Sequence, residues 1–358
     1  MTRNNACRRR ELLGAAAGLV AGWSPARSFA QERRSPDGSG RPMPDLEGAV
    51  AWLNSEPLRA QALWGQVVLV QFWTFTCVNW QRTLPYVNAW WEKYKDHGLV
   101  VIGVHTPEFS FERDVANVRE QAGQLRIGFP VAVDSNQAIW GAFRNAAWPA
   151  LYLVDAKGVI RHRHDGEGEY ESAERWIQQL LAEAGAKDVP AGVVRVEARG
   201  SQAPADWVQL RTPETYTGYG KAERFRSPGG MVADRKRAYE LPRRLPDISW
   251  AAAGEWVFAS EAARSEGRNA RIVSRFRARD VNLVMGAMQR DRPVPFRVRI
   301  DGRAPGEAHG SDADAGGLGL MAERRLYQLV RQSGAIRDRD FEIEFLEPGA
   351  EVYVFTFG

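Results

Sequence analysis

The hydrophobic pattern changes midway along the chain, and this change most limits what the chain can fold into. From Leu46 to about Ala186, stretches with helical spacing alternate with short apolar runs at 67–73, 99–105 and 149–155. Buried strands that alternate with helices predict an open α/β sheet covered by helices. From about residue 225 only strand-like segments follow, several with period-2 alternation, and turn signals such as "DGRAPG" separate them. This second part predicts an all-β sandwich or jelly roll.

The first 30 residues have the pattern of an export signal. Three arginines (8–10) precede a weakly apolar stretch that ends at Trp23, and "SPARSFAQ" offers a small-residue cleavage point after Ala30. The stretch is shorter than the roughly 20 apolar residues of a membrane span, so we expect no span after cleavage. "RRELL" is similar to the twin-arginine signal, with the Sec route as the alternative. These features predict a bacterial protein of the periplasm, or one exported by another route.

Removing this signal changes what the charge and the cysteines imply. The whole chain has a net charge of +4, and residues 1–30 carry five arginines against Glu11, so the rest is formally neutral. We therefore expect no nucleic-acid partner. Of the 2 cysteines, Cys7 lies in the signal, which leaves Cys77 without an internal disulfide partner.

Cys77 stands where a reactive thiol is expected. In "QFWTFTCVNWQRTLPYV" it lies between an apolar run and a helix that begins near Val78. Backbone N–H groups at a helix N-terminus stabilise a thiolate, so we predict a pKa below the usual value of about 8.5. A buried, inert cysteine is the alternative.

Several segments resemble a known family. "WTFTCVNWQRTLPYV", "VIGVHTPEF", "WPALYLVD" and "HDGEGEYESAE" are similar to the periplasmic thioredoxin domain of DipZ-type proteins, which are relatives of TlpA. "TPETYTGYG", "FRVRIDGRAPGEAHG" and "FEIEFLEPGAEVYVFTFG" resemble the β domain that follows it. The family's membrane-embedded domain is not found in this sequence, and an export signal stands in its place. The resemblance implies an α/β thioredoxin fold followed by a β-sandwich, with these divisions: signal 1–30, flexible leader 31–44, thioredoxin-like domain 45–187, linker and entry to the β domain 188–224, and β-sandwich 225–358.

The resemblance also implies which residues form the site. Pro149 matches the cis-proline that faces the nucleophile, so Cys77 and Pro149 are the catalytic candidates. The family's second cysteine falls at Trp80, and the acidic residue of thioredoxins falls at Gln71. Trp80 could shield the sulfur, contact an apolar partner or fill the space of the lost cysteine. The supporting candidates are Trp73, Thr74, Trp80, His105 and Trp148.

His105 and two further histidines have open roles. His105 follows the apolar run 99–105 and could lie beside the thiol and tune its pKa, or it could cap the next turn. His162 and His164 lie on one predicted strand and fall short of a metal site. We expect neither a metal nor a cofactor.

Three functions stay open. We favour a monothiol oxidoreductase whose Cys77 forms a mixed disulfide with a disulfide-bearing or oxidised-thiol protein, resolved by an external thiol or reductase. A thiol peroxidase is the second, because Thr74 and Cys77 form a Thr-x-x-Cys element, although Val70 stands where its proline belongs. The third is a redox-inactive binding module whose β domain binds a glycan or a protein. Its arginines 275, 277 and 279 alternate with apolar residues, a pattern that is also typical of a solvated face.

Overall fold

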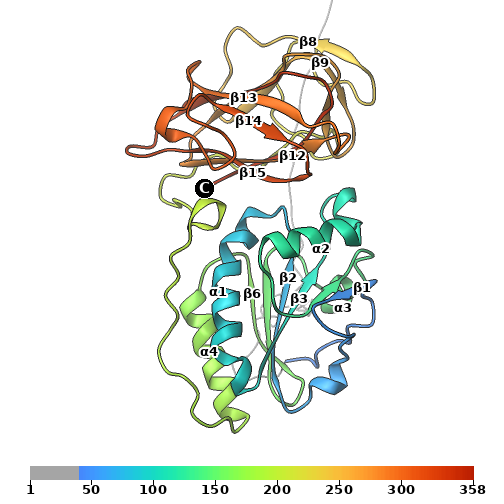
Figure 1. Cartoon of the computed structure of the whole chain (residues 1–358), viewed down its shortest axis with the longest axis vertical. Coiled ribbons are helices and arrows are strands. Elements are labelled where there is room, and N and C mark those ends of the chain that lie inside the picture. The colour runs from blue at the N-terminus through green and yellow to red at the C-terminus, as the bar shows by residue number, and fades with distance from the viewer. Residues whose placement is uncertain (1–39) are drawn as a thin grey trace, which may run out of the picture.

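The computed structural model describes residues 40–358, which form two domains stacked end to end (Figure 1). The predicted export signal and residues 31–39 of the predicted leader lie outside the described residues. Residues 40–44, the end of that leader, lie along the edge of the first sheet. There Met43 N–H donates to Gly158 O at 2.8 Å, and Ile160 N–H donates to Arg41 O at 3.1 Å. Within residues 40–358, no helix is both long enough and apolar enough to cross a membrane.

The first domain is built on a mixed sheet with the strand order β1-β4-β3-β2-β5-β6. Its strands are β1 (Ala51–Leu53), β2 (Val67–Trp73), β3 (Leu99–His105), β4 (Val131–Val133), β5 (Ala150–Val154) and β6 (Ile160–Asp165). β2 pairs in parallel with β3 and antiparallel with β5, which places β2 in the middle of the sheet. The strands predicted at 67–73 and 99–105 are confirmed, and the one predicted at 149–155 covers 150–154.

Helices cover both faces of this sheet. They are α1 (Val78–Tyr94), α2 (Val115–Gln124), α3 (Ala138–Phe143) and α4 (Tyr170–Glu183). Every side chain of β2 is buried, because alternate residues point into two separate cores. Leu69 and Trp73 pack in the core that holds α1 and α4, whereas Val70 and Phe72 pack in the core that holds α3. The predicted α/β sheet flanked by helices is confirmed.

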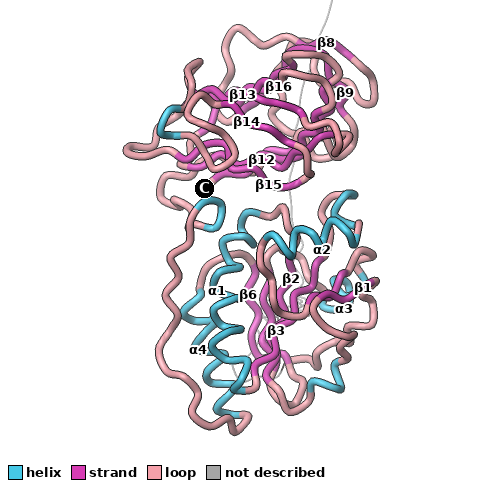
Figure 2. The backbone as a smooth tube through the Cα atoms, in the orientation of Figure 1, coloured by secondary structure: helices cyan, strands magenta, loops and turns pink. Residues whose placement is uncertain are grey.

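A long connection, residues 184–214, joins the domains and runs beside α4 and α1 (Figure 2). The buried carboxylate of Glu174 on α4 anchors it, accepting a hydrogen bond from Val194 N–H at 2.7 Å and others from Lys93 Nζ and Tyr94 OH. Further along, the short 3-10 helix η5 (Gly200–Gln202) lies against α1, where Ser201 Oγ donates to Gln81 Oε1 at 2.7 Å. The connection is therefore fixed to the first domain over much of its length.

The second domain is all β, as predicted. Within the described residues its strands follow the order β14-β13-β16-β11-β9-β10-β17-β12-β15, with β7 beside β17 and β8 beside β9. The strands are β7 (Thr215–Tyr216), β8 (Arg237–Tyr239), β9 (Ser249–Phe258), β10 (Ala263–Ser265), β11 (Ala270–Phe276), β12 (Asp280–Ala287), β13 (Val294–Ile300), β14 (Leu318–Met321), β15 (Arg325–Arg331), β16 (Arg339–Phe345) and β17 (Ala350–Phe357). β9 pairs with both β11 and β10, so it joins the two halves of the sandwich.

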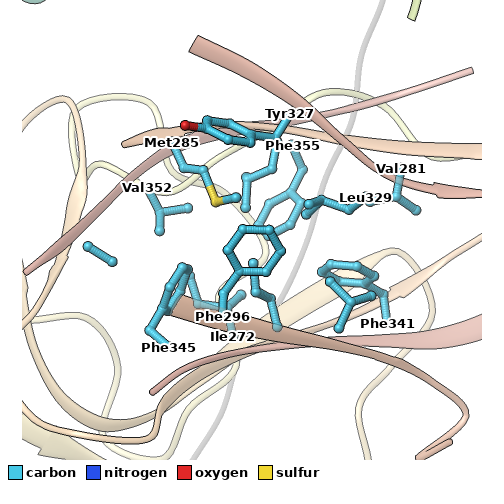
Figure 3. Close-up of a cluster of buried hydrophobic side chains, with 14 of the residues drawn as sticks. Ile272, Val281, Met285, Phe296, Tyr327, Leu329, Phe341, Phe345, Val352 and Phe355 are labelled. Carbon is cyan, nitrogen blue, oxygen red and sulfur yellow. The ribbon is translucent and has the colours of Figure 1, made fainter. Parts of the chain in front are cut away.

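The two halves enclose an apolar core (Figure 3). Phe296 and Phe341 from β13 and β16 face Met285, Tyr327 and Phe355 from β12, β15 and β17. Burial of such large side chains between two sheets is the main stabilising contribution to a domain of this kind.

The two halves differ in what covers their outer faces. β11, β13 and β16 alternate between buried and half-buried residues, which is typical of a sheet with one solvated face. In β12 and β17 every residue is buried. Their inner faces pack in the sandwich core, and Val284 and Val354 on the opposite faces pack against the first domain. The sheet that contains β12 and β15 accordingly lies next to that domain in Figure 1.

Candidate functional site around Cys77

Cys77 lies at the junction between the central strand and the first helix of the first domain. β2 ends at Trp73, a turn follows, and Cys77 is the N-cap residue of α1, with its N–H donating to Thr74 O at 3.2 Å. The thiol does not itself cap the helix. Instead, the backbone N–H groups of Asn79 and Trp80 point toward the sulfur. The side chain is half-buried and is the free cysteine of the described part of the chain.

The pKa of this thiol is raised well above its usual range. Burial is the main cause, and the carboxylates of Glu214 and Glu108 raise the pKa further. The N–H groups of Trp80 and Asn79 act in the opposite direction but are outweighed. The prediction of a lowered pKa is therefore wrong for this arrangement. It considered the helix N-terminus alone, and left out the burial of the thiol and the charges of Glu214, which precedes β7, and Glu108.

Pro149 faces Cys77 as predicted. The Trp148–Pro149 peptide bond is cis, and Cys77 Sγ lies 3.8 Å from Trp148 O. The Trp148 ring packs on Trp140, with the ring centroids 4.4 Å apart. The structure thus brings three of the candidate residues, Cys77, Trp148 and Pro149, to one place.

Trp80 fills the first-domain core. Its side chain is fully buried in the core between the sheet and α1, where it stacks on Trp73 with a centroid distance of 4.3 Å. Its indole N–H donates to Oε1 of Gln71 at 3.3 Å. Of the three roles considered for Trp80, the structure therefore supports filling the space of the lost cysteine.

His105 and Thr74 contact each other. Thr74 Oγ1 lies 3.4 Å from His105 Nε2, and both side chains are buried. The imidazole packs edge-on against Trp73 and stacks on Phe75, and this burial lowers the pKa of His105 to about 3. A neutral imidazole adds no positive charge that would lower the pKa of the thiol, which gives no support to the tuning role considered for His105. Thr74 faces His105, which gives no support to the peroxidase interpretation of the Thr-x-x-Cys element.

A buried glutamate, which the sequence did not single out, ties the loop before Cys77 to the loop after β3. Thr76 Oγ1 donates to Glu112 Oε1 at 2.6 Å, and the N–H groups of Glu108 and Phe109 donate to Glu112 Oε2 at 2.7 and 2.9 Å. Burial raises the pKa of Glu112, although its hydrogen bonds partly offset this. An acid followed by an arginine in a polar stretch carries no sequence signal for such a role.

The second domain and the end of the connection before it contribute residues that the sequence also missed. Tyr216 on β7 donates its hydroxyl to Glu108 Oε1 at 2.6 Å, and Lys221 Nζ donates to the same oxygen at 3.0 Å. Glu214 Oε2 also accepts from Tyr216, at 3.4 Å. These residues lie more than 100 positions away from Glu108 in the chain, so local sequence patterns could not bring them together.

The arginines singled out on the β domain are engaged with carboxylates. Their ion-pair partners are Asp247 and Asp340 for Arg275, Asp338 for Arg277, and Asp280 for Arg279. Paired arginines on a strand face are typical of a solvated surface, so their alternation gives no evidence for a glycan site.

Comparisons with known proteins also divide the chain into two parts. Residues 39–163 match the family model described as the AhpC/TSA family, and residues 212–358 match the one described as a thioredoxin-like C-terminal domain. Protein DipZ of Mycobacterium tuberculosis (strain CDC 1551 / Oshkosh) is 40% identical over 247 residues, which cover 68% of this chain and 35% of DipZ. The chain therefore spans about a third of the length of DipZ.

Two further proteins are similar to the first domain alone. Thiol-disulfide oxidoreductase YkuV of Bacillus subtilis (strain 168) is 36% identical over 143 residues, which cover 40% of this chain and 96% of YkuV. The solution structure of a thioredoxin-like protein in the oxidized form is 35% identical, with a TM-score of 0.38, and covers 40% of this chain and 97% of that one.

Proposed function

This chain belongs to the DipZ- and TlpA-like redoxins, and we propose that it is a thiol–disulfide oxidoreductase that acts through the single thiol of Cys77. The observation that carries the proposal is the position of Cys77 at the N-terminus of α1, with Sγ 3.8 Å from the carbonyl oxygen that precedes Pro149. Within residues 40–358 there is no second cysteine, and Trp80 stands where the family places it.

The proposed reaction has two exchange steps. The Cys77 thiolate attacks one sulfur of a substrate disulfide, the S–S bond breaks, and one half leaves as a thiolate that takes up the proton lost by Cys77. An external thiol then attacks the substrate sulfur of the mixed disulfide, which releases the second half as a disulfide with that thiol and restores Cys77. A further exchange with external thiol completes the reduction, so the enzyme needs a thiol or a partner reductase but no second cysteine.

The proposal includes export. The signal-like residues 1–30, with a twin-arginine element at residues 9–10, suggest delivery to the periplasm as a folded protein. A compartment with an oxidising poise would present disulfides to this thiol.

The decisive experiment is to trap the mixed disulfide. The purified protein is incubated with hydroxyethyl disulfide, quenched with acid and analysed by intact mass, beside Cys77→Ser. We expect one added mercaptoethanol group on the native protein, none on Cys77→Ser, and its removal by added thiol. If the native protein stays unmodified even at alkaline pH, where the thiolate of Cys77 forms, the proposal is wrong.

One observation favours a second candidate, a binding protein whose redox centre is retired. The raised pKa of Cys77 keeps the sulfur protonated at neutral pH, and a protonated thiol is a poor nucleophile. If the folded protein shows no thiol exchange even at alkaline pH, this candidate replaces the first. The search for a ligand, glycan or protein, then moves to the β domain.

A further inference from the structure

The second domain lies against the end of the first domain where α1 begins (Figure 1), and Cys77 is the N-cap residue of that helix. An apolar cluster joins the two domains at this place. From the first domain it includes Val78, which directly follows Cys77, and Phe109, which are only 1% and 3% exposed. From the second domain it contains Ala262, Val284, Leu326, Tyr353 and Val354.

The loop beside the thiol is also held by polar contacts with the second domain. Glu108 accepts the hydroxyl of Tyr216 at 2.6 Å and Lys221 Nζ at 3.0 Å. Two positions on, the N–H and the hydroxyl of Ser110 both donate to Glu261 Oε2, at 3.0 and 2.7 Å. This loop therefore cannot leave the second domain without losing four hydrogen bonds.

The helix that follows Cys77, α1, is fixed to the second domain as well. Arg82 on α1 is 2% exposed, pairs with Glu167 at 2.9 Å, and donates to Phe357 O of β17 at 3.3 Å. Domains in one chain move relative to each other by default unless the interface is large and apolar. Here the apolar packing of Val78 and the buried polar contact of Arg82 both join the first two turns of α1 to the second domain, which indicates a fixed arrangement.

Such a cover conflicts with a protein substrate. A thioredoxin-like site exchanges with a protein disulfide by letting an extended segment lie beside the nucleophile and the residue before the cis-proline. In this chain Val78, which directly follows Cys77, and Phe109 are covered by residues of β12, β15 and β17. An extended segment would have to displace those strands.

Space for a small molecule does exist at the domain boundary. One cavity of about 260 Å³ is lined by Glu108, Phe109, Tyr216, Lys221, Ser260 and Glu261. A second, of about 240 Å³, shares Tyr216 and Lys221 with it and reaches Glu214. Both are smaller than the roughly 300–1,000 Å³ of pockets that hold drug-sized ligands. Tyr216 lines both cavities and lies within electrostatic range of Cys77.

We infer that the C-terminal domain is a fixed lid that restricts Cys77 to small disulfides and excludes protein disulfides. This inference rests on the proposed function, because only a thiol that undergoes exchange has a substrate to select. It names the substrate class, which is narrower than the protein substrate implied by the family resemblance.

The test compares two disulfides on the purified, full-length protein. Rates of mixed-disulfide formation by Cys77 are measured with hydroxyethyl disulfide and with insulin. Each rate is divided by the rate at which glutathione reacts with the same disulfide at the same pH, which gives a normalised rate. We expect the normalised rate with insulin to be about 100-fold or more below that with hydroxyethyl disulfide, since exchange depends on access to the sulfur. Equal normalised rates would overturn the lid and leave the proposed function standing. If the protein reacts with neither disulfide, both the lid and the proposed function are wrong.

A lid variant and a matched control sharpen the result. Leu326→Glu places a charge in the interface cluster and leaves the sandwich core intact, because Leu326 points away from that core. Leu320→Glu makes the same change at a side chain that is 61% exposed on β14. We expect Leu326→Glu to raise the normalised insulin rate about tenfold or more, and Leu320→Glu to leave it unchanged. If Leu326→Glu does not fold, which circular dichroism would show, the comparison on the native protein still decides.

Discussion

The indole nitrogen of Trp80 lies 3.3 Å from Oε1 of Gln71, and both side chains are fully buried. The family resemblance places the second cysteine and the buried acid of thioredoxins at these two positions. A pair of residues that would share a proton is thus replaced by a donor and an acceptor that pair with each other, although Nε2 of Gln71 has no hydrogen-bond partner among the described residues. Trp80 also stacks on Trp73, so the space of the lost cysteine is filled by packing.

The pairing of Trp80 and Gln71 predicts coupled effects on stability. Trp80→Phe leaves Gln71 Oε1 without its donor, and Gln71→Leu leaves the indole N–H without its acceptor. Each unpaired buried group costs about 1–3 kcal/mol of unfolding free energy. The double variant should lose less than the sum of the two by about 0.5–3 kcal/mol, measured by urea denaturation. Strictly additive losses would show that the contact has no energetic role.

The lowered pKa of the buried His105 predicts that the protein loses stability in mild acid. Burial lowers its pKa from 6.5 to about 3, so the unfolded chain takes up a proton near pH 6.5 and the folded protein does not. Stability from this residue is complete above that pH and is lost as the pH falls toward 3. From pH 7 to pH 5 the loss is about 2 kcal/mol. Denaturant unfolding at both pH values tests this.

The control for His105 is a second histidine. Burial also lowers the pKa of His162, so this residue too lowers stability as the pH falls. We expect His162→Gln to keep most of the pH dependence of the unfolding free energy. His105→Gln should remove about 2 kcal/mol of it. A His105 ring that titrates between pH 5 and 8 by NMR would rule out the account given for this residue.

Local patterns in the sequence predicted much of the fold and part of the site. The apolar run 67–73 and the helix after Cys77 follow from periodicity, and the place of Pro149 follows from family resemblance. The contact of Tyr216 with Glu108 could not be predicted, because it joins residues 108 positions apart on different domains.

The raised pKa of Cys77 also escaped prediction, because its causes, the burial of the thiol and the charges of Glu214 and Glu108, depend on tertiary contacts. One signal was available in the sequence. "DVNLVMGA" and "AEVYVFTF" are nearly continuous apolar runs, unlike the alternating "ARIVSRF". Continuous runs predict strands covered on both faces, and here the second cover is the first domain.

The surroundings of Cys77 predict a thiol that reacts only at alkaline pH. Burial and the charges of Glu214 and Glu108 raise its pKa, so the midpoint of alkylation by iodoacetamide should lie above the value of about 8.5 for the unfolded chain in urea. Glu214→Gln removes one of these charges and should lower the midpoint. Glu223→Gln is the matched control. Glu223 lines the same cavity as Glu214 but is not among the causes of the raised pKa of Cys77. A native midpoint below 8.5 would contradict the structure.

The buried pair of Arg82 and Glu167 predicts a large stability loss at the domain boundary. The two side chains are 2% and 7% exposed, and Arg82 also holds the carbonyl of Phe357 near the C-terminus. Arg82→Ala leaves Glu167 as an uncompensated buried charge, which costs about 3–5 kcal/mol. Glu167→Gln in the same chain removes that charge and should recover part of the loss.

A surface ion pair gives the comparison for Arg82. Arg175 and Glu171 on α4 are 67% and 63% exposed, so Arg175→Ala should change the unfolding free energy by about 1 kcal/mol or less. Because Arg82 ties α1 to β17, Arg82→Ala should also speed alkylation of Cys77 at fixed pH, and Arg175→Ala should not. If Arg82→Ala destabilises the protein but leaves alkylation unchanged, Arg82 stabilises the first domain alone and does not hold the second domain over the thiol.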